Sequence, residues 1–263
     1  MKVPFHIVEA RRTQLAELVS REGYLPVAEL CARLGISEAT ARRDLVALAK
    51  DQTITRTHGG ALIEYNQRFP SFRERQAVAD GAKRRIAAAV GGLLKPGTTW
   101  WFDGGTTVFR CAEWLAAQQR AAQPLPGLVI VTNSLPVAEV LADHDGLAVH
   151  LLGGQFFRRS SLLLGGRGLA NLAEWRFDGA VLGVEGLSAD GLWNSQADII
   201  ALQRAVQARS QNTVIAADAS KLGARAAEFL GDWRFPHCLV SDAGAAELRV
   251  AGISLAAGQH LHP

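Results

Sequence analysis

The sequence contains few cysteines, no long apolar segment and no spacing typical of a metal site. Its three cysteines, Cys31, Cys111 and Cys238, are odd in number and far apart, which favours reduced, buried thiols in a cytoplasmic protein over a disulfide framework. No stretch of about 18 apolar residues occurs, and the N-terminus lacks an apolar signal region, so we expect neither membrane insertion nor export. We also expect no metal and no cofactor.

The net charge is also small, at +3 over 263 residues. Acidic and basic residues nearly balance within residues 1–63, so charge alone does not indicate a nucleic-acid-binding protein. The length has room for a small domain of about 60 residues and a larger one of about 180. Any function must therefore be sought in residue patterns.

Residues 36–48, ISEATARRDLVAL, have the pattern of a capped amphipathic helix. Ser37 offers a hydroxyl to the free N–H groups of the helix start, and Ala41, Leu45 and Leu48 recur at the spacing of one buried stripe. The side chains off this stripe could enter a DNA major groove: Ala39, Thr40, Arg42 and Arg43. By itself, however, R-R-D on a helix is more typical of a solvated face with charge partners four residues away.

The neighbouring segments favour DNA binding. Residues 27–34 form another helical stripe ended by Gly35, and two helices joined by a tight turn make a helix-turn-helix, whose second helix reads base edges. Residues 53–63, TITRTHGGALI, alternate as a strand, turn at the two glycines and resume as a strand. This pattern predicts a hairpin wing, with Arg56 and His58 as further candidate DNA contacts.

Two linked motifs now carry a family resemblance. L-x-I-S-x-x-T-A-R-R-D-L-x-x-L at 34–48 and R-x-H-G-G-A at 56–61 resemble the winged helix-turn-helix of the DeoR family of bacterial sugar-metabolism repressors. The resemblance implies a DNA-binding domain at residues 1–63. It also implies that the protein binds a pseudo-palindromic, double-stranded operator as a homodimer or homotetramer.

The remaining parts of the first 80 residues fit around these motifs. Residues 6–22 have a helical period and are expected to form the first helix, with Arg11 and Arg12 facing phosphate or solvent. Residues 64–80 show no clear period and include Pro70. We interpret this second stretch as the linker.

From residue 81 to residue 263 one pattern recurs: a short apolar strand, then small polar or glycine residues, then a helical stretch. Residues 100–102 precede D-G-G-T-T, for example, and residues 128–131 precede T-N-S. Strands that alternate with helices predict an α/β domain with a mostly parallel sheet covered on both faces. Ligands bind such sheets beyond the carboxyl ends of the strands, so the polar loops should converge there.

The loop at residues 103–107, D-G-G-T-T, suits a phosphate. Its glycines let backbone N–H groups approach a ligand closely, its threonines add hydroxyl donors, and the following helix presents its positive dipole end. The alternative is a tight strand-to-helix turn with a threonine cap and no ligand. Lys221 also follows a strand end, where its ammonium could pair with a phosphate or sugar oxygen. Gly153-Gly154 is by itself more typical of a turn than of a site.

These loops resemble those of the DeoR-family sensor domain, whose fold is similar to that of ribose-5-phosphate isomerase. The resemblance covers nearly the whole chain. It implies that a phosphorylated sugar or sugar derivative binds an effector-sensing domain at residues 81–263 and changes DNA affinity. The candidate effector-binding residues are Asp103, Gly104, Gly105, Thr106, Thr107, Thr132, Asn133, Ser134, Gly153, Gly154, Arg158, Glu185 and Lys221.

One segment departs from the family pattern. Near residues 194–205 the family often shows an acidic-Ala-x-x-Lys-Arg pattern, whereas this sequence has Ile199 and Gln203 in the acidic and lysine places. The run G-L-W followed by S-K-L-G-A-R-A is somewhat similar to the branch that includes the L-ascorbate utilisation repressor, whose effector is a phosphorylated sugar acid. A carboxylate on the effector would require a second cation, Arg158 or Arg225.

An enzyme is the alternative function. Because the sensor domain resembles an isomerase, a carboxylate at the sheet edge could act as a general base on a sugar phosphate. The candidates are Asp103, Asp178, Glu185 and Asp218. This isomerase hypothesis leaves residues 1–63 without a role. We therefore favour a repressor whose operator binding is controlled by a phosphorylated sugar or sugar acid.

Overall fold

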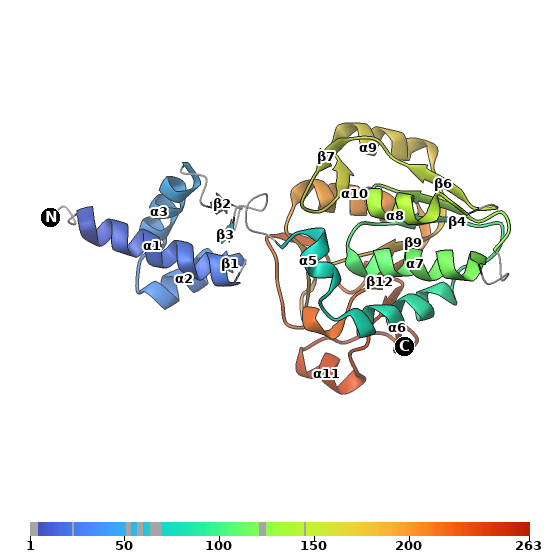
Figure 1. Cartoon of the computed structure of the whole chain (residues 1–263). Helices are drawn as coiled ribbons and strands as arrows, with labels where there is room; N and C mark the ends of the chain where they lie inside the picture. Colours follow the sequence, from blue (N-terminus) through green and yellow to red (C-terminus); the bar gives the residue numbers. More distant parts are fainter. Residues whose placement is uncertain are drawn as a thin grey trace. The chain divides into compact units, whose positions relative to one another are not determined.

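The computed structural model describes residues 5–22, 24–50, 54–56, 60–63, 70–120, 125–144 and 146–263. The chain divides into two compact units, Met1–Phe69 with Arg225–Glu228 and Pro70–Ala224 with Phe229–Pro263, and Figure 1 colours it from blue to red along the sequence. None of the described helices has the length and apolarity needed to cross a membrane. The domain limits expected from the sequence stay a prediction.

In its described residues the N-terminal unit combines three helices with a small sheet of order β1-β3-β2. Strands β2 and β3 pair antiparallel, with Ile54 opposite Ile63, as expected for the wing. The elements are α1 (Phe5–Glu22), β1 (Tyr24–Pro26), α2 (Val27–Leu34), α3 (Glu38–Lys50), β2 (Ile54–Arg56) and β3 (Gly60–Ile63). The predicted helix-turn-helix with its wing is confirmed.

The turn between α2 and α3 follows from two residues. Gly35 has a φ of 62°, a left-handed conformation that suits glycine, and its N–H donates to the carbonyl of Cys31. Ser37 then caps α3, because its hydroxyl accepts from the N–H of Thr40 at 3.3 Å. The expected stripe of α3 is buried in one core with apolar residues of α1, β1 and α2: Leu15, Val19, Leu25, Val27, Leu30, Ala41, Leu45 and Leu48.

The second unit is built on a seven-stranded sheet of order β15-β14-β12-β9-β4-β5-β6, in which every neighbouring pair is parallel. Its strands are β4 (Thr99–Phe102), β5 (Val129–Thr132), β6 (Ala148–Leu151), β9 (Phe177–Leu182), β12 (Ser210–Ala216), β14 (Cys238–Val240) and β15 (His260–Leu261). All but the last were expected from apolar runs. The predicted α/β architecture is therefore confirmed.

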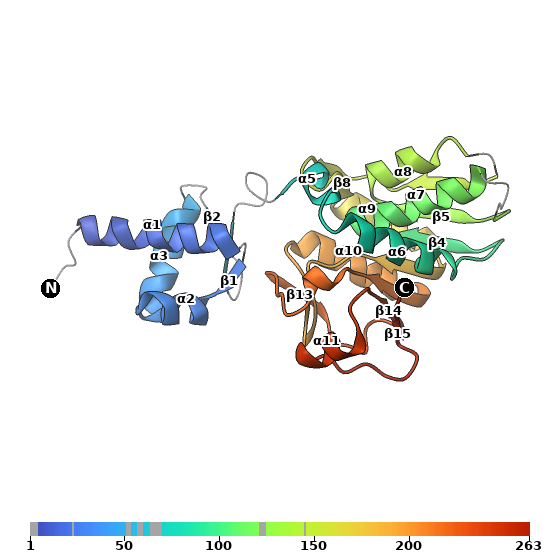
Figure 2. The same ribbon diagram turned by 60° about the horizontal axis from the view of Figure 1, so that its bottom comes forward.

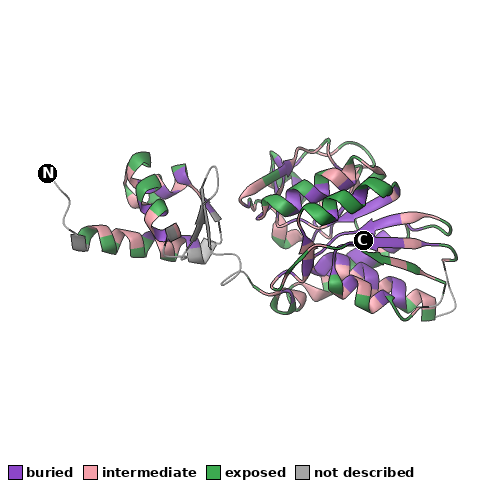
Figure 3. Cartoon of the chain, turned by 90° about the horizontal axis from the view of Figure 1, so that it is seen from above, coloured by how far each residue is buried: buried purple, intermediate pink, exposed green. Residues whose placement is uncertain are grey.

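Helices cover both faces of this sheet (Figure 2). One face packs against α6 (Asp80–Gly91), α7 (Thr106–Arg120) and α8 (Leu135–Leu141), and the other against α10 (Ala197–Gln207) and α11 (Ala245–Val250). Along β4 the side chains alternate, so that Trp100 and Phe102 enter one core and Trp101 enters the other. Figure 3 shows the sheet buried and the outer faces of the helices exposed.

Shorter elements were not expected from the sequence. A hairpin of β7 (Gln155–Phe157) and β8 (Leu162–Leu164) is followed by α9 (Gly166–Asn171) and the 3-10 turn η1 (Leu172–Glu174). A second sheet has the order β10-β11-β13, from β10 (Gly186–Ser188), β11 (Gly191–Asn194) and β13 (Glu228–Gly231). Strands of three or four residues are too short to show a period.

Part of the expected linker belongs to the second unit. Helix α5 (Phe72–Gln76) begins with a capping box, in which Ser71 and Glu74 each bond the other's backbone N–H. Phe72 is buried and meets the ring of Phe109 edge to face at 5.4 Å. The N–H of Phe72 also donates to the carbonyl of Arg159 at 2.8 Å. Five helical residues show no recognisable period, which is why this helix was not expected.

The cysteines are all unpaired, as expected. Cys111 is buried and burial raises the pKa of its thiol to about 12. Cys31 and Cys238 are only half-buried. The expectation that all three thiols are buried is therefore wrong for these two, because each lies at the margin of its core.

Candidate functional site

The predicted DNA-reading face of α3 is open to solvent. Ser37, Ala39, Arg42 and Arg43 are exposed and Thr40 is half-buried. Arg42 forms an exposed ion pair with Glu38 one turn earlier, at 3.2 Å. In this one respect the solvated-face alternative holds, and so exposed an ion pair contributes little to stability.

The wing contributes two further candidate DNA contacts. Arg56 is placed as a residue of β2, opposite Ala61 of β3. His58 lies outside the described residues. Contacts of either residue with DNA stay a prediction, as do those of the α3 face.

Asp44 differs from the other charged residues of α3, because it is 1% exposed. Its two carboxylate oxygens accept from Nε of Arg11 at 2.6 Å and from Nε of Arg12 at 3.1 Å. The two arginines therefore do not simply face solvent. They join α1 to the inner side of α3, and the R-R-D motif combines two outward cations with one inward anion.

In the second unit, the D-G-G-T-T loop lies at the carboxyl end of β4, between β5 and β9. Asp103, Gly104, Thr106 and Thr107 are buried, and the two threonines form the first turn of α7. A Cβ at position 104 would lie 2.2 Å from Cδ2 of Leu162, so any other residue there would require the buried Leu162 side chain to move. The loop is thus held closely beneath β8, with the N-terminus of a 15-residue helix behind it.

Asp103 is the centre of a buried hydrogen-bond network. Its Oδ2 accepts from Nε2 of Gln203 at 2.6 Å and from the N–H of Gly183 at 3.3 Å. Gln203 is held in turn by Nδ2 of Asn194, at 2.8 Å from its Oε1. Burial raises the pKa of Asp103 to about 6, and these donors only partly offset that effect. Gln203, where the family often has lysine, therefore holds the carboxyl without neutralising it.

The T-N-S loop follows β5 directly and is also buried. Thr132 Oγ1 accepts from the N–H of Ser134 at 3.0 Å, and Nδ2 of Asn133 donates to the carbonyl of Leu163 at 3.2 Å. Among the described residues, Oδ1 of Asn133 and Oγ of Ser134 have no hydrogen-bond partner. Buried polar atoms without a partner are costly, so these two atoms can accept a hydrogen bond from water or from a polar ligand.

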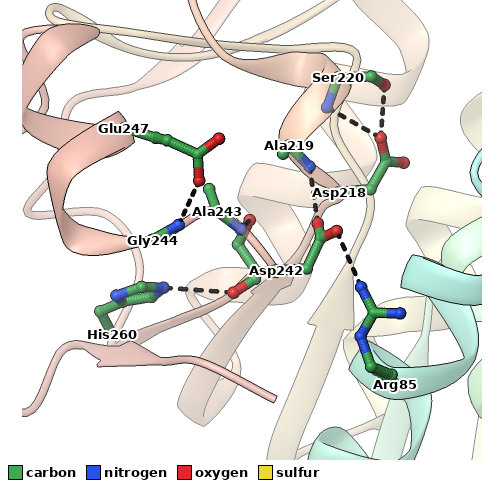
Figure 4. A network of polar contacts seen from close by, with 10 residues as sticks. Arg85, Asp218, Ala219, Ser220, Asp242, Ala243, Gly244, Glu247 and His260 are labelled. Atoms are coloured by element: carbon green, nitrogen blue, oxygen red, sulfur yellow. Dashed lines mark hydrogen bonds and ion pairs between the residues drawn. The ribbon is translucent and has the colours of Figure 1, made fainter.

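The third group of polar residues surrounds the loop after β12. Asp218 is 1% exposed, and its Oδ1 accepts from the N–H of Ser220 at 3.1 Å, as Figure 4 shows. Its Oδ2 has no partner among the described residues. The neighbouring Ala219 N–H donates to Oδ1 of Asp242 at 2.8 Å. Lys221 closes this turn, η2 (Ala219–Lys221).

Glu185 connects this group to the end of β9. The hydroxyl of Ser195 donates to its carboxylate. Burial raises the pKa of Glu185, and the Ser195 hydrogen bond and the positive charges of Arg75 and Lys221 act in the opposite direction. Arg75 and Lys221 are therefore near enough to act on this carboxyl electrostatically. Four of the predicted loops, after β4, β5, β9 and β12, meet at one edge of the sheet.

Three further candidates, Gly154, Arg158 and Asp178, lie outside these four loops. A Cβ at Gly154 would lie 2.6 Å from the carbonyl oxygen of Leu164, so close packing against β8 already requires glycine there. Arg158 is exposed in the turn between β7 and β8. Asp178 is at the opposite edge of the sheet, where its carboxylate accepts from the N–H of Thr99 at 2.8 Å. The expectation that Asp178 could act as a general base on a sugar phosphate is therefore wrong.

Sequence reasoning missed Asn194, the last residue of β11, and Ser195, which comes directly after it. It also missed Lys83, which is 3% exposed although lysine side chains are almost never fully buried unless they are paired. The spacing of Lys83, Ile86, Ala87 and Val90 could have revealed it, because a lysine at the first position of an apolar stripe faces the core.

Comparison with known protein families gives two matches in the same order as the two units. Residues 11–67 match the DeoR-like helix-turn-helix domain, and residues 79–243 match the DeoR C terminal sensor domain. The glycerol-3-phosphate regulon repressor of Escherichia coli strain K12 is 30% identical over 234 residues, which cover 89% of this chain and 90% of that protein. The HTH-type transcriptional regulator UlaR of Shigella dysenteriae is 30% identical over 226 residues, 84% of this chain and 85% of that protein. Because both relatives are 30% identical to this chain, the identities do not favour one of them over the other.

Among solved structures, a D-ribose-5-phosphate isomerase in complex with phospho-erythronic acid is 13% identical. The match covers 54% of this chain and 53% of that chain, with a TM-score of 0.41. The assignment rests instead on the two family matches and on the full-length relatives. The chain belongs to the DeoR family of DNA-binding transcriptional regulators and is a regulator rather than an enzyme.

Proposed function

We propose that this protein represses a carbohydrate-utilisation operon and that a phosphorylated sugar or sugar acid, bound at the carboxyl edge of the large sheet, changes its affinity for operator DNA. The DNA-binding half is supported by the exposed face of α3, which carries Ser37, Ala39, Thr40, Arg42 and Arg43. Paired arginines with short polar neighbours suit guanine edges and phosphates.

The effector half is carried by one observation, the unpartnered buried atoms beside the D-G-G-T-T loop. Asn133 Oδ1 and Ser134 Oγ lie in the neighbouring loop without partners among the described residues. The N-terminus of α7 offers N–H groups and a positive dipole end to a phosphate. Lys221 adds a cation and Asp103 an acceptor for a hydroxyl group. This combination suits a small molecule with both phosphate and hydroxyl groups.

Operator binding and effector binding must be linked through a difference in affinity. An effector relieves repression only if its affinity is higher for the arrangement of the protein that binds DNA poorly. Such coupling is usually worth about 1 to 3 kcal/mol. The proposal includes a homodimer or homotetramer on a pseudo-palindromic operator, since symmetric sites match symmetric proteins. It places the protein in the cytoplasm, where both ligands occur.

A tryptophan-fluorescence titration of the full-length protein tests the effector half. All six tryptophans lie between residues 100 and 233, and Trp100 and Trp101 immediately precede the proposed phosphate loop. The titrants are ribose 5-phosphate, sn-glycerol 3-phosphate, phosphorylated sugar acids and their unphosphorylated parents. We expect a saturable change that requires the phosphate and that is weakened at least tenfold in Lys221→Ala.

The same samples test the link to DNA. A duplex that the protein selects from a random-sequence library serves as the probe, and the titrant that changed the fluorescence should change its affinity. Lys221→Ala should bind this duplex normally without effector. A response equal for phosphorylated and unphosphorylated sugars, or no response across the panel, would refute the effector half and leave the DNA-binding half standing.

A further inference from the structure

Lys83 is a buried cation to which the proposed sites assign no role. It lies in the first turn of α6, and its neighbours on the same stripe, Ile86, Ala87 and Val90, are buried in the core between α6, α7 and the sheet. Burial of an ammonium group is costly unless it finds acceptors. The groups around Lys83 belong to two different parts of the second unit.

The first acceptors belong to α5 and the turn that follows it. Nζ of Lys83 donates to the carbonyl oxygen of Arg75 at 2.8 Å and to that of Val78 at 2.5 Å. Carbonyl groups at the end of a helix have no partner within the helix, and a lysine is a favourable partner for them. One ammonium group therefore holds the carboxyl end of α5 onto α6.

The second neighbour is the loop after β12. The carboxylate of Asp218 attracts the charge of Lys83, whereas Lys221, Arg75 and Arg110 repel it. Burial lowers the pKa of Lys83, and the Asp218 charge opposes this effect. Asp218 keeps one oxygen without a partner among the described residues, visible in Figure 4 as the oxygen without a dashed line. Lys83 thus lies in the field of the loop that carries Lys221.

The other end of α5 is attached to the same site. The N–H of Phe72 donates to Arg159 in the turn between β7 and β8, and its ring packs on Phe109 in the first turns of α7, directly after the D-G-G-T-T loop. Both attachments of α5 therefore rest on elements that carry predicted effector residues. Helix α5 is also the first described element after residue 69, so it leads directly from the DNA-binding part of the sequence.

We propose that Lys83 is a positioning residue that couples the effector site to α5. In the absence of an anion, its ammonium is bonded to the carbonyls of Arg75 and Val78 and holds α5. An anionic effector next to Lys221 provides a stronger acceptor, draws the ammonium toward the loop after β12 and loosens the carboxyl end of α5. This inference rests on the proposed function for the nature of the effector, but the hold on α5 does not depend on it.

Hydrogen–deuterium exchange on the full-length protein tests the coupling. The probes are inorganic phosphate, ribose 5-phosphate and sn-glycerol 3-phosphate at concentrations that saturate the fluorescence change. In the wild type we expect an anion to raise the exchange of amides in residues 72–78 several-fold. Lys83→Met, which keeps the apolar stem, should show this raised exchange without anion and little further increase with it.

Arg84→Met is the matched control, because Arg84 is the next residue, is exposed and pairs with Asp80 at 2.9 Å. It should exchange and respond like the wild type. Peptides from β9 and β12 report whether each variant is folded. If these peptides show that Lys83→Met is not folded, the wild type alone tests the proposal, because the expected rise in amide exchange at residues 72–78 needs no variant.

Two results would overturn the inference. One is anion binding by the wild type without any change of exchange at residues 72–78. The other is a folded Lys83→Met variant that responds to the anion as strongly as the wild type does. Failure of the wild type to bind any of the three anions would instead contradict the proposed effector and with it the anion-driven step. Raised exchange in Lys83→Met without anion would still identify the hold on α5.

Discussion

Asp103 is a buried carboxyl group, and the side chain that donates to it is a neutral amide and not a cation. It is 3% exposed, and the donors to its Oδ2 are Gln203 and the backbone of Gly183. Neutral donors of this kind stabilise the carboxylate less than an ammonium group would. The group therefore binds its proton more tightly in the folded protein than in the unfolded chain.

This difference predicts a pH-dependent stability of the second unit. With the pKa of Asp103 at about 6 against an ordinary 3.8, the folded protein binds more protons than the unfolded chain between these values. The contribution of Asp103 to stability is complete below pH about 4 and is lost as pH rises through about 6, by up to about 3 kcal/mol at about 1.4 kcal/mol per pKa unit. Asp103→Asn removes this loss. Its unfolding free energy relative to wild type should therefore rise between pH 4 and 6.

Urea unfolding followed by tryptophan fluorescence at several pH values measures the effect. Asp232→Asn is the control, because Asp232 is an exposed aspartate whose pKa is held below its ordinary value by hydrogen bonds from Arg234. The contribution of Asp232 changes mainly below pH about 4, so the stability of that variant should run nearly parallel to wild type between pH 4 and 6. An Asp103→Asn variant whose stability runs parallel to wild type from pH 4 to 6 would contradict the prediction.

Two buried charged residues, Asp44 and Lys83, were missed although both lie on apolar helical stripes. Asp44 lies three residues after Ala41 and one before Leu45, and Lys83 lies three before Ile86, so the helical period placed both inward. The partners could not be predicted in the same way. Gln203 and Asp103 are 100 residues apart in the sequence, and only the closing of the sheet brings them together.

At the scale of elements, α3 has two faces with different roles. Its outer face carries the exposed ion pair of Arg42 with Glu38, and its inner face carries Asp44 with Arg11 and Arg12. The outer pair leaves 53% and 62% of the two side chains exposed, so solvent screens most of its attraction. The inner group is the one that contributes to the attachment of α1 to α3.

Asp44→Ala should therefore loosen the N-terminal unit. It leaves two partly buried guanidinium groups without their acceptor, a cost of about 1 to 3 kcal/mol given that Arg11 and Arg12 keep 19% and 29% exposure. Hydrogen exchange of α1 and α3 amides in the full-length protein should become about 5- to 150-fold faster.

Glu38→Ala is the matched control on the same helix, since it breaks the exposed pair and should cost under about 1 kcal/mol. Equal effects of the two substitutions would show that the buried ion pairs contribute no more than the exposed one. Faster exchange in α7 or α10 of Asp44→Ala would show that the substitution acts beyond the N-terminal unit.

The elements themselves were predictable to the extent that their own residues define them. Strands such as β4 and β12 are apolar runs that end in polar loops. Helix α3 has a cap and a buried stripe, and Gly35 ends the helix before it. The hairpin of β7 and β8 and the sheet of β10, β11 and β13 consist of strands of three or four residues. Their pairing depends on packing against the large sheet and leaves no period in the sequence.

At the scale of the whole molecule, the chain has separate hydrophobic cores. Among the described residues, the core of the N-terminal unit shares no residue with the two cores on either side of the large sheet. Small domains bury a limited fraction of their surface and have little stability to spare. The DNA-binding unit should therefore be the one that a single core substitution unfolds.

Leu45→Ala provides the test, because Leu45 is 1% exposed and its loss should cost about 2 to 5 kcal/mol, enough to unfold a unit of this size. We expect lost DNA binding and reduced helical circular dichroism, while the tryptophan unfolding midpoint and the anion titration stay at wild-type values, because every tryptophan belongs to the second unit. Val46→Ala, a 36%-exposed neighbour on the same helix, should change stability by less than about 0.5 kcal/mol. A shifted tryptophan midpoint in Leu45→Ala would mean that the second unit draws stability from the first, and effector binding could then not be interpreted from the sensor residues alone.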